Sequence, residues 1–229
     1  MIKVYNSPRM ALNPLCEYVS EATASRRNSI IKKSKAPVTF ITRWYNKAED
    51  ILAYYLSEIR DDPEYLKLEI DRLRTGHHSD EMERKYAITS AFSLRSFLVN
   101  ELSIRKILSP FRLFIAINDT QHKFILRGVQ ISLRPELIVR DSLGRQQLGF
   151  IKFYFGKEPL SNARGELMAC LTKHYFQLEH GFNFDNQHCM VIDVYRGQIF
   201  YAPKAFKRRV ADIEASCQEI ADRWDKISL

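Results

Sequence analysis

Glycine is scarce in this sequence, and the glycine-rich loops of nucleotide-binding enzymes are absent. The 229 residues include eight glycines, and none of them belongs to a GxxxxGKS/T, GxGxxG or GxSxG motif. The first two motifs bring backbone N–H groups up to a phosphate, and the third exposes the nucleophile of a serine hydrolase. Their absence argues against these classes of nucleotide-binding protein and hydrolase.

Cysteine and long apolar segments are also in short supply. The four cysteines form no CxxC pair, which argues against a metal knuckle and favours a reduced compartment. No stretch approaches the ~18 consecutive apolar residues of a membrane span. The first residues lack the charged-then-apolar plan of a signal peptide. We therefore expect a cytoplasmic protein with no membrane partner.

Hydrophobic residues are present in ordinary amounts, and positive charge is in excess. Hydrophobic residues make up 45% of the chain and aromatic residues 12%, which suits a packed core. Thirty-five Lys and Arg residues against 27 Asp and Glu residues give a formal net charge of +8. Such a field attracts phosphate groups or an anionic membrane surface. We expect nucleic acid ahead of other anionic partners.

The apolar periodicity changes near Ser109 and Pro110, where we place a domain boundary. Upstream, apolar residues recur every three or four positions, which predicts amphipathic helices over residues 43–59, 64–74 and 80–107. Residues 1–108 are therefore expected to form a helical N-terminal region, whose last helix, about residues 80–107, packs on the core. Residues 109–229 are expected to form that core and its C-terminal helix.

Short segments rich in β-branched and aromatic residues mark the second half of the chain. They predict strands over residues 111–117, 124–133, 136–139 and 148–155, and a hairpin over 190–195 and 198–201. Ser161 is a candidate cap for a helix over residues 163–178, and a last helix is expected to begin at Pro203. This order predicts an α+β protein, with a helical N-terminal region followed by a mixed-sheet α/β core.

One predicted hairpin brings an acid and a lysine together. If its turn is centred on Leu143 and Gly144, Glu136 lies opposite Ile151 or Lys152. A carboxylate can hold a divalent cation, while a nearby lysine can orient a water or stabilise charge on a phosphate. The register therefore predicts the elements of a phosphodiester-hydrolysing site.

The same residues carry a resemblance to a known group of enzymes. Pro135 and Glu136, the hairpin, and the run Phe150-Ile151-Lys152 resemble the PD and (D/E)XK elements of the PD-(D/E)XK nuclease superfamily. The resemblance implies a restriction-endonuclease-like core of a helix, three strands, a helix and a fourth strand, over about residues 80–201. It also implies nucleic-acid hydrolysis that depends on Mg²⁺ or Mn²⁺, by an endonuclease or an exonuclease.

Carried over by position, the resemblance gives each of these residues a role. Glu136 takes the place of the metal-binding Asp, and Lys152 takes the place of the lysine. Phe150 departs from the pattern, because it stands where the superfamily has its second acid. Some members supply that carboxylate from the following helix, and Glu166 is the candidate here, so the implied metal ligands are Glu136 and Glu166. Alternatively, the site is inactive and the fold serves for binding.

Plainer interpretations remain open for the same side chains. Glu136 and Lys152 would also form an ordinary cross-strand ion pair, worth at most ~1 kcal/mol on a solvated face. Glu166 would also be an exposed helical acid paired with Lys173 or Arg164. Lys152 lies in an apolar strand, where a charge is costly unless it has a partner or faces a cleft. We therefore regard Lys152 as the strongest candidate.

Two groups of basic residues are candidates for nucleic-acid contacts, and a solvated helix face is the alternative for each. Neutralising phosphates releases counterions, so such binding weakens steeply with salt. The first group is Arg26, Arg27, Lys32, Lys33 and Lys35, and the second is Lys204, Lys207, Arg208 and Arg209.

These observations lead to one preferred function and two alternatives. We expect a nucleic-acid-binding protein that acts as a metal-dependent nuclease, with DNA expected ahead of RNA. The first alternative is a catalytically inactive nuclease-fold binding module of the mobile-element or phage-defence kind. The second is a protein-interaction subunit whose charge aids solubility. A homodimer or a complex with another protein is compatible with each.

Overall fold

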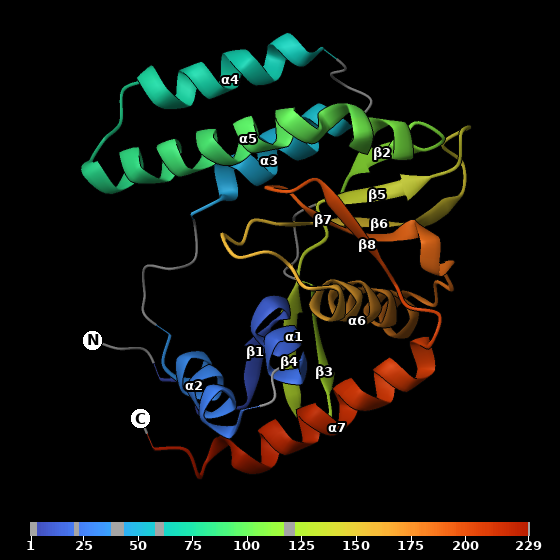
Figure 1. Ribbon diagram of the computed structural model, residues 1–229. Helices are drawn as coiled ribbons and strands as arrows, with labels where there is room; N and C mark the ends of the chain where they lie inside the picture. Colours follow the sequence, from blue (N-terminus) through green and yellow to red (C-terminus); the bar gives the residue numbers. More distant parts are fainter. Residues whose placement is uncertain (1–3, 21–22, 38–43, 58–61, 117–121, 229) are drawn as a thin grey trace.

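A five-stranded mixed sheet lies at the centre of the protein (Figure 1). The computed structural model describes residues 4–20, 23–37, 44–57, 62–116 and 122–228. β6 and β7 run parallel, and the other neighbouring pairs are antiparallel. In spatial order the strands are β2 (Arg112–Ile115), β5 (Leu137–Arg140), β6 (Gln147–Tyr154), β7 (Cys189–Asp193) and β8 (Gln198–Tyr201).

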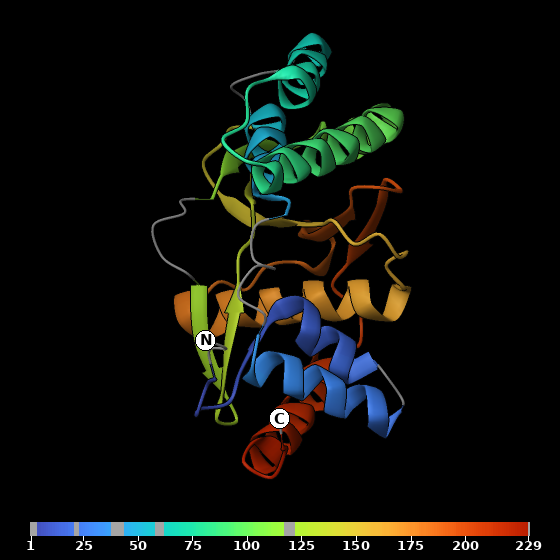
Figure 2. The same cartoon turned by 90° about the vertical axis from the view of Figure 1, so that its left-hand side faces the viewer.

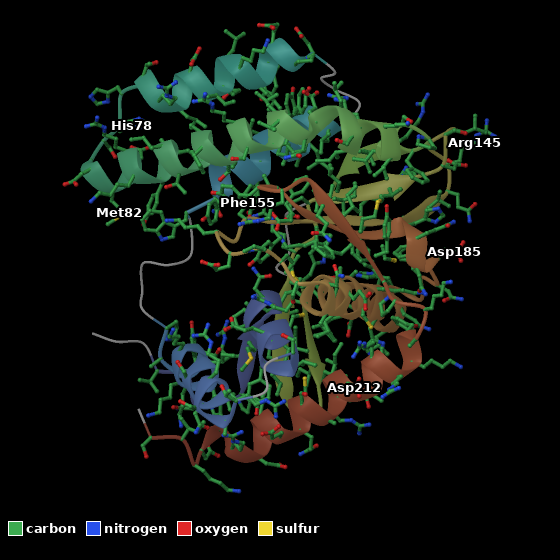
Figure 3. All side chains as sticks on the ribbon, in the orientation of Figure 1. His78, Met82, Arg145, Phe155, Asp185 and Asp212 are labelled. Carbon is green, nitrogen blue, oxygen red and sulfur yellow. The ribbon has the colours of Figure 1, made fainter. Side chains whose placement is uncertain are left out.

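One face of this sheet is covered by helices from a single stretch of chain. Asp62 and Asp80 cap two of them by accepting hydrogen bonds from the N–H groups of Glu64 and Glu83. Phe155, labelled in Figure 3, is buried on this side and stacks on Tyr45 with 5.2 Å between ring centres. We call these helices the α3–α5 layer: α3 (Asn46–Leu56), α4 (Pro63–Thr75) and α5 (Glu81–Leu108).

The opposite face is covered by helices from both ends of the chain, as Figure 2 shows. Ser161 caps α6 by accepting from the N–H of Arg164, and Gly181 ends it with a φ of 69°. Leu15, Tyr18 and Ile31 are buried in the same core as Phe150 of β6. We call this side the α6 layer: α1 (Leu12–Ser20), α2 (Ala24–Lys35), α6 (Asn162–His180) and α7 (Phe206–Trp224).

A second, smaller sheet belongs to the core of the α6 layer. The single strand expected over residues 124–133 is wrong, because Arg127 and Gly128, with φ angles of 47° and 79°, reverse the chain there. The resulting hairpin pairs with a short strand from the N-terminal end, which runs parallel to its second strand. In spatial order the strands are β1 (Arg9–Ala11), β4 (Val129–Leu133) and β3 (His122–Leu126).

The expected α+β class is confirmed: helices predominate before residue 109 and the five-stranded sheet follows. The last helix begins at Phe206, three positions after the expected Pro203. Residues 43 and 58–59 of one expected helix, and residue 117 of an expected strand, lie outside the described residues. None of the helices in the described ranges combines the length and apolar character needed to cross a lipid bilayer.

Candidate functional site

The hairpin of β5 and β6 brings Glu136 beside Lys152, as the sequence predicts. Leu137 lies opposite Ile151, and the ladder continues with a hydrogen bond of 3.0 Å from the N–H of Glu136 to the carbonyl of Ile151. The ammonium of Lys152 then forms an ion pair with Oε1 of Glu136. The outer turn of this hairpin carries Arg145, which is labelled in Figure 3.

Both oxygens of the Glu136 carboxylate have partners inside the protein. Oε1 accepts from Nζ of Lys152, and Oε2 accepts from the backbone N–H of Phe153 at 2.6 Å. Because Leu137 pairs with Ile151, that N–H lies one step beyond the end of β5. The carboxylate therefore takes the place of the next main-chain acceptor on the ladder. The side chain of Glu136 is 2% exposed and that of Lys152 is 12% exposed, so the pair is almost dry.

Burial changes the acid–base behaviour of Glu136. It raises the pKa of the carboxyl group to about 7, although the ammonium of Lys152 acts in the opposite direction. The nearby carboxylate of Glu49, on the first turn of α3, raises the pKa further. Near neutral pH this carboxyl group therefore exists in both protonation states.

A cleft of about 240 Å³ opens beside Glu136. Residues of α3 form one wall, and Arg134 forms an ion pair of 3.2 Å with Asp50 across it. The second carboxylate near Glu136 is thus Glu49, which sequence reasoning missed because α3 and β5 are far apart in the chain. The cleft is lined by Glu49, Asp50, Ala53, Tyr54, Ile115, Arg134 and Glu136.

The position where the superfamily has its second acid is filled by an aromatic pair. Residues of β6 alternate between the two faces of the sheet, so Phe150 and Lys152 point toward the α6 layer. Phe150 is fully buried and stacks on Phe176 of α6, with ring centres 5.5 Å apart and planes at 18°. A carboxylate at this position would be enclosed by apolar side chains.

The structure does not bring Glu166 to this pair. Glu166 shares a face of α6 with Cys170 and Lys173, at the i, i+4 and i+7 positions. That face lies against the start of α7: Sγ of Cys170 is 3.9 Å from the carbonyl of Phe206, and the Lys173 ammonium lies 4.5 Å from the centre of its ring. Within the described residues, no hydrogen bond or ion pair joins Glu166 to Glu136 or Lys152.

The partners expected for Glu166 as a plain helical acid are also engaged elsewhere. Arg164 lies 3.9 Å from the carboxylate of Glu17 on α1. Lys173 donates to the side-chain oxygen of Asn186 at 2.6 Å. Neither forms an ion pair with Glu166 in the described part of the chain.

The described residues hold no group of three or more His, Cys, Asp or Glu side chains that could bind a metal ion. Mg²⁺ is nevertheless commonly held by one or two carboxylates together with water and substrate phosphates. Glu136 and Glu49 are the two carboxylates that this cleft offers.

Several of the basic residues predicted to bind nucleic acid serve the fold instead. Arg26 donates to Glu17 at 2.6 Å, Arg27 pairs with Glu219 at 3.4 Å, and Lys35 donates to the carbonyl of Trp224 at 2.7 Å. In the second group, Arg209 lies 3.6 Å from Asp212, which is labelled in Figure 3. The remaining members are exposed: Lys32, Lys33, Lys204, Lys207 and Arg208.

Comparison with known proteins assigns no family to this chain. No protein-family model matches the sequence, and no curated protein sequence matches it significantly. The functional conclusion therefore rests on the geometry of the residues described above.

Proposed function

We propose that the protein binds nucleic acid on a nuclease-like scaffold in which Glu136 and Lys152 stabilise the end of the sheet instead of cleaving the strand. The observation that carries this proposal is the engagement of both Glu136 oxygens, by Lys152 and by the N–H of Phe153. A carboxylate committed in this way, with its pKa raised by burial, is a weak ligand for a cation.

The order of the elements supports the scaffold part of the proposal. α5, β2, β5, β6, α6 and β7 follow one another as a helix, three strands, a helix and a fourth strand, with the β3 and β4 hairpin inserted after β2. α5 and α6 lie on opposite faces of the sheet. This is the order that the PD-(D/E)XK resemblance implies.

The exposed basic residues support nucleic acid as the partner. Lys32 and Lys33 lie on α2, whose Lys35 contacts the C-terminal end of α7, while Lys204, Lys207 and Arg208 lie at the start of α7. A helix of 19 residues spans about 28 Å. The two groups are therefore separate patches, and a strand that contacts both runs along α7.

Fluorescence anisotropy of a labelled single strand, titrated in EDTA at increasing salt, tests this proposal. We expect binding at low salt that weakens as salt rises. Exchanging Lys204→Glu with Lys207→Glu should weaken it at least tenfold. Exchanging Arg95→Glu with Lys106→Glu makes the same charge change on α5 and should have a smaller effect. A wild-type protein that binds no strand at low salt would refute the proposal.

The second candidate is metal-dependent hydrolysis with Glu49 in place of Glu166. The observation that favours it is the cleft, because Glu49 and Glu136 both line it and interact. Bound Mg²⁺ would supply a Lewis acid and an activated water. Glu136 and Glu49 would hold it, and the ammonium of Lys152 would stabilise negative charge on the phosphate.

Cleavage assays with Mg²⁺ or Mn²⁺ distinguish the ligand sets. Loss of cleavage in Glu49→Gln but not in Glu166→Gln would support Glu49. The reverse result would restore the pair that the resemblance implies. Absence of cleavage by the wild-type protein on single-stranded and duplex DNA and RNA would exclude both ligand sets.

The proposed location is the cytoplasm. All four cysteines are buried free thiols: Cys16, Cys170, Cys189 and Cys217. Proteins of oxidising compartments commonly pair such residues in disulfides. The free thiols therefore support a reducing compartment.

A further inference from the structure

A second cleft, of about 480 Å³, lies next to the Glu136 cleft. Ile115 lines both clefts, and Pro135, which directly precedes Glu136, lines the second one. The second cleft is formed by the ends of β2 and α6, the start of β3, and residues of β5 and β6. Its volume lies in the range of sites that hold small molecules, roughly 300–1,000 Å³.

Aromatic rings form most of one wall of this cleft. Phe176 and Phe182 line it together with Phe114 on the opposite side. Phe184 covers one face of the Phe182 ring, with centres 5.2 Å apart and planes at 14°. Phe182 is still 38% exposed, so part of its ring is available to a ligand in the cleft. This wall can accept a flat aromatic ligand by stacking.

Polar groups are placed at the rim. The hydroxyl of Tyr175 lies 2.8 Å from Nδ1 of His122 and 3.1 Å from Nε2 of His180, so it links the two imidazoles. Burial, followed by His180 and Arg134, lowers the pKa of His122, which favours the neutral imidazole. Neutral imidazoles can both donate and accept hydrogen bonds.

A guanidinium completes the site. Arg140 lies 4.5 Å from the centre of the Phe114 ring, and Gln147 lines the cleft beside it. The cleft therefore combines stacking surface, neutral hydrogen-bonding groups and one positive charge. This combination matches a nucleobase attached to a phosphate-bearing strand and does not match a purely apolar ligand.

We propose that this cleft receives one unpaired nucleobase, stacked on Phe182, of the strand that the protein binds. The inference rests on the proposed nucleic-acid binding and adds to it a preference for unpaired bases. A base within a duplex has both faces covered by its neighbours and its hydrogen-bonding edge engaged by its partner. Only an unpaired base offers a free face to Phe182 and a free edge to the rim.

The test uses a single strand that contains 2-aminopurine, whose fluorescence reports stacking, and its matched duplex, both in EDTA with the full-length protein. The wild-type protein should quench the probe and bind the single strand at least tenfold more tightly than the duplex. Phe182→Leu keeps an apolar side chain but removes the ring, and it should weaken single-strand binding roughly tenfold. Phe182→Tyr keeps the ring and should restore both quenching and affinity.

Leu178→Ala is the matched control, because Leu178 is 54% exposed near the end of the same helix and does not line the cleft. It should bind both probes like the wild-type protein. If Phe182→Leu also binds and quenches like the wild type, the base site is refuted while nucleic-acid binding stands. If the wild-type protein binds neither probe at low salt, the underlying proposal fails as well.

Discussion

The two faces of the five-stranded sheet are covered in different ways. The α3–α5 layer comes from one continuous stretch, and its helices pack mainly on one another and on the odd-numbered residues of β6. The α6 layer joins α1 and α2 from the N-terminal end to α6 and α7 from the other half. Local patterning can build the first face, whereas the second depends on contacts between distant segments.

The candidate site lies where these two layers meet. Glu136 contacts the end of β6, and its cleft is walled by α3 from one layer. Lys152 points toward the other layer, where Phe150 and Phe176 close the sheet. A single charged residue in this apolar strand is tolerated because its partner is supplied from the end of β5.

Removing residues 1–37 should break the comparison most severely. Leu15, Tyr18 and Ile31 are fully buried in the α6 layer, and burying each such side chain contributes about 1.5–3 kcal/mol. Their loss approaches the whole stability of an ordinary domain, about 5–15 kcal/mol. We expect the fragment 44–229 to show no cooperative thermal transition by near-UV circular dichroism. An unchanged melting temperature would show that the α6 layer does not need these helices.

Alanine at Phe150 or at Phe153 compares the two faces on one strand. Both rings are almost fully buried, on opposite sides of β6. Each substitution should lower the free energy of unfolding by about 3–5 kcal/mol. In urea denaturation, both variants should show one transition, because the layers share the sheet. Two separate transitions in either variant would mean that the faces unfold independently.

Lys152→Met should destabilise the protein by about 3 kcal/mol at pH 8, because it leaves the Glu136 carboxylate buried without its cation. At pH 5 the loss should be smaller, since Glu136 is then protonated. Combining it with Glu136→Gln should recover most of the stability at pH 8. Glu166→Gln is the control and should change the free energy of unfolding by less than about 0.5 kcal/mol. Equal losses at pH 5 and pH 8 would contradict a buried charge as the cause.

The pH dependence of the wild-type protein gives the smallest expected effect. The pKa of Glu136 is about 7 in the folded state and near the ordinary 4.5 when unfolded, so the folded state binds more protons between these values. In EDTA, this group should therefore lower stability as pH rises from about 4.5 to about 7, on the order of 1–3 kcal/mol. Glu136→Gln should flatten the curve in this window. A slope that is the same in both proteins would contradict the assignment.

Local signals predicted much of the α3–α5 layer and the hairpins. Asp62, Asp80 and Ser161 are helix caps as expected, and the turn at Arg196 and Gly197 joins β7 to β8. The neighbourhood of Glu136 and Lys152 also followed from the hairpin alone, because cross-strand register is fixed over a short distance in the chain.

Long-range features could not be predicted in the same way. The reversal at Arg127 and Gly128 carries only a brief Arg-Gly signal inside a run of strand-forming residues. Nothing in residues 9–11 indicates pairing with β4, and nothing in α3 indicates that Glu49 lies near Glu136. Such contacts depend on how separate layers pack, and a single sequence does not specify that packing by local pattern.

The most direct test of the central claim is a paired measurement on one sample. Binding of a labelled single strand is measured by anisotropy in EDTA and again after excess Mg²⁺ and Mn²⁺, and the strand is then analysed on a denaturing gel. If Glu136 and Lys152 are structural, the affinity should be the same in both conditions and the strand should remain intact. Metal-dependent cleavage that disappears in Glu136→Gln would contradict the claim and establish a nuclease.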